Sequence, residues 1–155
     1  MRAYIWKFVY PLYENEDHFS LNFGERLSEP DGSIYGAISE GAAAEEFVRR
    51  IAQHGQEVRL LQDPANFLNR YEHWVGIENP WVRRSVAFTH IVQGNVLAAK
   101  DHLEFILRKD ASAMIPQFVD GVQMISKALD SGLDEARAIL LAWENQTKQK
   151  LGLDG

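Results

Sequence analysis

The chain has 155 residues, enough for one ordinary domain with a sizeable hydrophobic core. It contains no cysteine, which excludes disulfides, thiolate metal sites and cysteine nucleophiles. The 16 basic and 22 acidic residues give a net charge of −6, and residues 1–40 carry three basic and seven acidic residues. Nucleic-acid binding depends on lysines and arginines that neutralise phosphates, so this charge argues against a nucleic-acid partner and favours a basic protein partner.

The N-terminal segment does not have the pattern of a signal peptide, because Lys7 interrupts its apolar run and no small-residue cleavage site follows. No apolar stretch of the sequence approaches the roughly 20 residues that span a bilayer. We therefore expect a soluble, cytoplasmic protein without a membrane partner. The sequence leaves its oligomeric state open, including a homo-oligomer.

The first 38 residues are predicted to be rich in β-strand. Residues 4–10 alternate in a period of two that is typical of a strand, and residues 18–27 repeat this pattern. A strong turn signal at residues 29–32 separates them from a short third strand over residues 33–38. The pattern predicts an antiparallel hairpin or a three-stranded sheet. The face that packs on the helices carries Tyr4, Trp6, Phe8 and Tyr10.

Helical periodicity begins near residue 42. A first helix is predicted over residues 42–53, with Gly55 as its stop, and residues 57–61 are ambiguous between a strand and an extended link. Asp63-Pro64 has the pattern of a helix start, and the apolar spacing continues to Val75 before Gly76.

Two helical hairpins are predicted after residue 79. Asn79-Pro80 begins a helix over residues 80–93, and the Gly94-Asn95 turn leads into a helix over residues 96–108. A further helix ends near Gly132, and the last one covers residues 134–150. Together these patterns predict an α+β fold. It is a single domain over residues 1–155, β-rich over 1–38, with about six helices arranged as hairpins over 42–150.

Two segments resemble known families. Residues 88–107, FTHIVQGNVLAAKDHLEFIL, resemble one tetratricopeptide hairpin, with Gly94-Asn95 at the turn and Ala99 at the small position of the second helix. Trp81 and Pro116 depart from that repeat. Residues 4–27, with the words FVYPLY and LNFGERL, resemble small bacterial proteins, some of which are grouped with immunity proteins of polymorphic-toxin systems. This resemblance implies a bacterial origin and a toxin-neutralising role.

The five histidines have no local spacing typical of metal binding, so we expect no metal site and no cofactor. His102 falls on the apolar face of its helix and is interpreted as a core or interface histidine, whereas His90 falls on the polar face and is expected to be solvated. A metal site assembled from distant histidines is left open. No arrangement of a nucleophile, a carboxylate pair or a phosphate loop stands out, so no catalytic residue is assigned.

The candidate partner-binding residues form an acidic loop and two flanking anchors. The loop contains Glu14, Glu16 and Asp17 next to the aromatic Tyr13, a pattern that suits a basic partner but is most often a solvated turn. Trp81 and Arg84 lie at the start of a helix and are interpreted either as a second anchor or as packing and surface residues.

The sequence therefore favours a non-enzymatic protein-binding module, with an immunity-type inhibitor as one form of it. The alternative is a small-ligand-binding protein or an enzyme whose site lies between sheet and helices. That alternative site would use Arg70, Tyr71 and His102.

Overall fold

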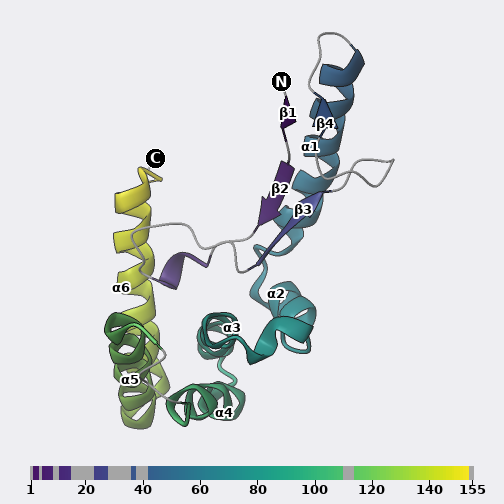
Figure 1. Ribbon diagram of the computed structural model, residues 1–155. Helices are drawn as coiled ribbons and strands as arrows, with labels where there is room; N and C mark the ends of the chain where they lie inside the picture. Colours follow the sequence, from purple (N-terminus) through teal and green to yellow (C-terminus); the bar gives the residue numbers. More distant parts are fainter. Residues whose placement is uncertain are drawn as a thin grey trace. The chain divides into compact units, whose positions relative to one another are not determined.

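The computed structural model describes residues 2–3, 5–8, 11–14, 23–27, 36–37, 42–109 and 114–153 (Figure 1). The chain divides into two compact units. The first unit consists of Met1–Tyr10 and Ser20–Asp63, and the second, called here the helical unit, consists of Pro11–Phe19 and Pro64–Gly155. Each unit is described by itself, and the single-domain organisation stays a prediction.

The first unit contains short strands and one long helix. Strand β1 (Arg2–Ala3) pairs antiparallel with β4 (Gly36–Ala37), and β2 (Ile5–Phe8) pairs antiparallel with β3 (Gly24–Leu27). Helix α1 (Ala42–Leu60) contacts β2. The described residues of the first unit thus form two two-stranded ladders (Figure 1).

The predicted α+β class is wrong, because the described structure is mainly α-helical, with six α-helices. The strand elements are only two to four residues long, and the described residues form no three-stranded sheet. Ladders this small cannot form a layer that defines a fold. The described part of the helical unit contains no strand. Residues 18–22 and 33–35 of the predicted second and third strands lie outside the described residues.

Helix α1 continues past the predicted stop at Gly55 and includes residues 57–60, which had been interpreted as a strand or a link. A glycine inside a helix costs only about 1 kcal/mol relative to alanine, and the good helix formers Gln56, Glu57 and Arg59 follow it. An isolated glycine is therefore a weak stop signal when the residues after it favour the helix.

The helical unit begins with the 3₁₀ segment η1 (Leu12–Glu14), which packs on the last helix. The predicted helix starts at Pro64 and Pro80 and the turn at Gly94 are confirmed, whereas the helix after Pro64 ends at Tyr71, earlier than expected. The remaining elements are α2 (Pro64–Tyr71), η2 (Val75–Glu78), α3 (Pro80–Gln93), α4 (Val96–Leu107), α5 (Pro116–Ser131) and α6 (Leu133–Leu151).

Helix α3 lies at the centre of the helical unit. It contacts α2, α4 and α6, and its side chains from Arg84 to Ile91 are all buried. Phe88, Ile91 and Val86 are fully buried there. Because neighbours surround this helix, it has no wide solvent-facing stripe, unlike the surface helix of a globular protein. Polar residues of α3 therefore face other helices.

Both ends of α3 are capped by specific contacts. The Asn79 side chain accepts a hydrogen bond from the Trp81 amide at 3.0 Å, which satisfies one of the free amides at the helix start. Gly94 ends the helix in the left-handed region at φ 84°. Arg137 of α6 donates to the carbonyls of Ile91 at 3.1 Å and Val92 at 2.8 Å. These contacts hold the last turn of α3 against α6.

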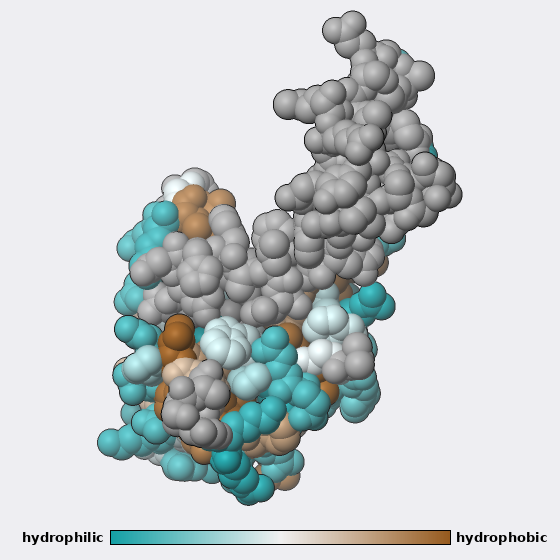
Figure 2. Space-filling model, viewed as in Figure 1, coloured by the Kyte–Doolittle hydropathy of each residue, from teal (hydrophilic) through white to brown (hydrophobic). Residues whose placement is uncertain are grey.

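The hydrophobic core of the helical unit is formed by helices α3 to α6. Its aromatic centre is Phe88, with the Trp143 ring centroid at 6.0 Å and the Tyr13 ring centroid at 6.1 Å. On the face drawn in Figure 2, hydrophilic residues cover most of the coloured surface, and apolar residues appear as smaller patches between them. Among the described helices, none combines the length and the apolar character needed to cross a membrane. The buried core comprises Ala87, Phe88, Ile91, Ala99, Leu103, Ile106, Phe118, Val122, Ile125, Ala128, Leu129, Ala136 and Leu140.

Candidate metal centre

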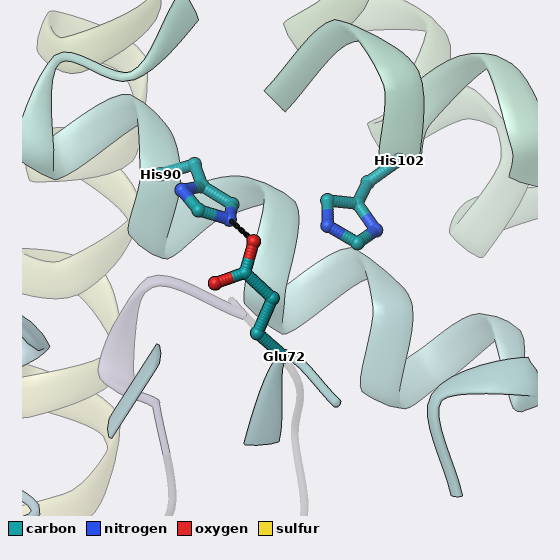
Figure 3. Close-up of side chains that lie close together, drawn as sticks. All are labelled: Glu72, His90 and His102. Carbon is teal, nitrogen blue, oxygen red and sulfur yellow. Dashed lines mark ion pairs between the residues drawn. The ribbon is translucent and has the colours of Figure 1, made fainter. Parts of the chain in front are cut away.

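Three side chains of metal-ligating type converge in the helical unit. They are Glu72, His90 and His102, and one ligand atom from each lies within 4.8 Å of the other two. Figure 3 shows the Glu72 carboxylate beside His90, with the His102 ring across from them. No second group of three such residues meets this distance criterion in the described part of the chain.

The three residues come from three separate segments of the chain. Glu72 lies in the turn directly after α2, where its amide still donates to the Leu68 carbonyl at 2.9 Å. His90 is in the last turn of α3, and His102 is in α4. The left-handed Gly94 lets α4 fold back along α3, and α2 packs on α3. These two packing contacts bring the three side chains together.

Within the cluster, His90 lies close to both Glu72 and His102. His90 Nε2 lies 3.2 Å from Glu72 Oε1, and the two imidazole rings stack with centroids 5.5 Å apart and 16° between their planes. The His90 side chain is 5% exposed, whereas that of Glu72 is 33% exposed. The cluster is therefore closed at His90 and reaches solvent at Glu72.

One imidazole nitrogen of the cluster has unmet hydrogen-bonding capacity. His90 Nδ1 lies 3.4 Å from Asn95 Nδ2 and His90 Nε2 lies 3.2 Å from Glu72 Oε1, whereas His102 Nδ1 is buried without a hydrogen-bond partner among the described residues. An unsatisfied buried polar atom typically costs about 1–3 kcal/mol. In folded proteins such atoms often mark the place of a bound water or ion.

The pKa of His102 is lowered from 6.5 to about 4. Burial, which disfavours the charged ring, is the largest cause, and the electrostatic effects of Arg83 and His90 act in the same direction. The carboxylates of Glu72 and Asp101 oppose this shift without cancelling it. The ring of His102 is therefore neutral at pH 7, which is the form that binds a metal ion.

Arg83 anchors the segment around the cluster. Its Nε donates to the Ile77 carbonyl at 3.1 Å, its guanidinium pairs with Glu78 at 3.2 Å, and its Cζ lies 3.5 Å from the centre of the Phe105 ring. Lys109 donates to the Glu78 carbonyl at 2.8 Å and lies 4.6 Å from the same ring. These contacts tie η2 to α3 and α4 next to His102.

We expect the metal-free protein to lose stability as the pH falls from about 6.5 towards 4. In that window the unfolded chain protonates His102 and the folded protein does not, so the unfolded state binds more protons and is favoured. Urea unfolding at several pH values measures this loss. The variant His102→Gln should show a shallower pH dependence between 6.5 and 4 than the parent, and an unchanged slope would contradict the assignment.

The structure agrees with the expected environment of His102 but not with that of His90. His102 lies partly buried in the cluster, consistent with its position on the apolar face, whereas the expectation that His90 is solvated is wrong, since that residue is 4% exposed. Sequence analysis did not select Glu72. Glu72, His90 and His102 lie in three different segments of the chain and match no local metal motif, so no local signal pointed to the set.

The candidate anchors of the partner-binding site pack inside the helical unit. The Tyr13 hydroxyl forms a hydrogen bond with the Thr89 hydroxyl, and the Trp81 ring lies 4.6 Å from that of Phe118. Arg84 is 5% exposed, with its guanidinium 4.7 Å from the Phe118 ring, a position that does not fit a surface contact. Glu14 lies in η1, and Glu16 and Asp17 lie outside the described residues.

The three residues proposed for the alternative ligand pocket lie in α2 and α4. Arg70 is exposed in the last turn of α2, and Tyr71 is buried, with ring centroids 4.9 Å from Phe67 and 5.8 Å from Trp74. The third member, His102, lies instead with His90 and Glu72.

Comparisons with known proteins identify no relative. No family model, no curated protein and no solved structure matches the chain. The resemblances to a tetratricopeptide hairpin and to immunity proteins stay predictions, and the function has to be inferred from the site itself.

Proposed function

We propose that the helical unit binds one divalent first-row transition-metal ion through Glu72, His90 and His102. The observation that carries this proposal is the convergence of three ligand atoms within 4.8 Å from three separate segments. The unsatisfied buried nitrogen of His102 supports it, because a metal bond would satisfy that atom.

The donor set indicates the class of metal. Two imidazoles and one carboxylate suit Zn²⁺ and also Fe²⁺, whereas Ca²⁺ and Mg²⁺ prefer sites made entirely of oxygen ligands. With three protein ligands, the set resembles in chemistry those sites in which a water or substrate completes the coordination of the metal. Zn²⁺ is the natural first probe because it has no redox chemistry of its own.

The distances are compatible with binding after a small adjustment. Bonds of about 2.0–2.2 Å in a tetrahedral site place two ligand atoms about 3.3–3.6 Å apart. The His90–Glu72 separation of 3.2 Å is within about 0.1 Å of this range. The widest separation, at most 4.8 Å, needs a shift of roughly 1 Å, the scale that side-chain rotation provides. Glu72, in a turn and partly exposed, is the ligand best placed to move.

The test is equilibrium dialysis of the metal-stripped full chain against Zn²⁺, with bound metal measured by plasma mass spectrometry. We expect one ion per chain, and parallel dialysis against Fe²⁺ under anaerobic conditions compares the two metals. Loss of a residue that only orients a metal-ligating side chain typically weakens metal binding by roughly 10–100-fold. Because Glu72 and His102 would bind the metal directly, Glu72→Gln and His102→Gln should each weaken Zn²⁺ binding by more than this.

His54→Gln is the matched control. His54 lies 3.3 Å from Glu57 in α1, so it forms a histidine–carboxylate pair outside the three-residue cluster. Its substitution should leave Zn²⁺ binding unchanged. Absence of bound metal in the parent, or equal losses in His54→Gln and the ligand variants, would overturn the proposal.

The protein-binding module expected from the sequence stays a second prediction. Two of its anchors, Tyr13 and Trp81, pack against the core. The described residues that expose the most apolar surface in the helical unit are elsewhere, with Leu97 at 81% and Leu141 at 58% exposure.

A further inference from the structure

We infer that the metal keeps a coordination position open for a small anion, which enters on the solvent side at Glu72 and is attracted by the charge of Arg83. This inference rests on the proposed function, because it concerns the ligand of that same metal. It goes further by assigning the chemical class of what the metal binds: a monoanion with a nitrogen or oxygen donor atom.

The first argument is the number of ligands. The described residues supply three ligand atoms, whereas Zn²⁺ and related ions bind at least four. Structural sites fill all four positions with protein side chains, and sites that act on a small molecule leave one to water or substrate. Among the described residues, the cluster belongs to the second kind.

The second argument is access. The side chain of His90 is 5% exposed and that of Glu72 is 33% exposed, so the cluster is closed on one side and open on the other. In Figure 3 the Glu72 carboxylate lies below the two rings. A ligand from solvent therefore reaches the metal along Glu72, without displacing the buried His90.

The third argument is charge. A divalent ion with one carboxylate and two neutral imidazoles carries one net positive charge. Close to His102, Arg83 contributes one positive charge, which is paired with the exposed Glu78 at 3.2 Å. The acid Asp101, next to His102, is exposed and more strongly screened by solvent. The balance at the metal favours an anion over a neutral or cationic ligand.

The test uses full-length protein loaded with Co²⁺, whose visible absorption bands depend on the number and kind of its ligands. Sodium azide is titrated at constant ionic strength with perchlorate as the balancing anion. We expect a saturable change in the bands. If the protein binds Co²⁺ but azide leaves the bands unchanged, the open coordination position is wrong and the metal site stands. If the protein does not bind Co²⁺, the proposed metal site itself is wrong.

Variants test the role of Arg83. Arg83→Gln should weaken azide binding about three- to tenfold, the effect of one charge near a partly exposed site. Arg83→Lys keeps the charge but loses the guanidinium contacts, so it should bind azide almost as well as the parent. Arg108→Gln removes an exposed charge paired with Glu104, and it should have no effect. Equal azide affinities of Arg83→Gln and Arg108→Gln would contradict the attraction of the anion by Arg83.

Discussion

Addition of Zn²⁺ to the metal-free protein is expected to raise its thermal unfolding midpoint by about 5–11 °C when the free metal is 100-fold above its dissociation constant. The metal binds a site that exists only when three separate segments are packed together, so it stabilises the folded state and not the unfolded chain. Circular dichroism at a helix wavelength, with and without Zn²⁺, measures the increment.

The increment, and not the absolute midpoint, is the quantity to compare between variants. Glu72→Gln, His90→Gln and His102→Gln should each lose most of it, even where the substitution itself changes stability. His54→Gln should keep it, and Mg²⁺ should not replace Zn²⁺. An increment of the same size in all four variants would show that Zn²⁺ stabilises the protein through other acidic residues.

Phe88→Ala is expected to lower the free energy of unfolding by about 3–5 kcal/mol. The Phe88 ring is fully buried in α3 and lies between the rings of Tyr13 and Trp143. Its removal takes away apolar contacts on several sides and leaves a cavity lined by elements that cannot all collapse into it. Urea unfolding followed by tryptophan fluorescence measures the loss.

Two further variants make this prediction decisive. Leu97→Ala removes a large apolar side chain that is 81% exposed, and it should change stability by less than about 0.5 kcal/mol. Phe88→Leu keeps an apolar side chain at the site and should lose less than Phe88→Ala, which covers the case in which the alanine variant does not fold. Equal effects of Phe88→Ala and Leu97→Ala would contradict the central position of this ring.

The helix starts at Pro64 and Pro80 could be predicted because their signals are local. In Asn79-Pro80 the Asn79 side chain satisfies an amide at the helix start, and this requires no distant contact. Gly94 is equally local, since its positive φ ends α3 whatever lies nearby. The error at Gly55 arose because a helix can continue through a glycine at modest cost. The expected β-layer failed because aromatic alternation indicates only a strand, and the ladders formed are too short to define the fold.

The candidate site could not be predicted, because it depends on tertiary contacts between separate helices. A helical wheel assigns His90 to a polar face, but this assumes that the helix has solvent on one side. Helix α3 is surrounded by α2, α4 and α6, so even its polar positions are buried. Glu72 belongs to the cluster because α2 ends directly before it, and no pattern in the surrounding sequence indicates this. Only the placement of His102 on an apolar face gave a partial indication.

The contact between Arg137 and the end of α3 has a consequence for the order of events during translation. Arg137 follows Val92 by 45 residues, and its guanidinium donates hydrogen bonds to the carbonyls of Ile91 and Val92. Before Arg137 is synthesised, the Ile91 carbonyl already accepts a hydrogen bond from the Gly94 amide, but both carbonyls lack the bonds from the guanidinium. The last turn of α3, which carries His90, therefore gains this tie to α6 only after α6 has left the exit tunnel and docked.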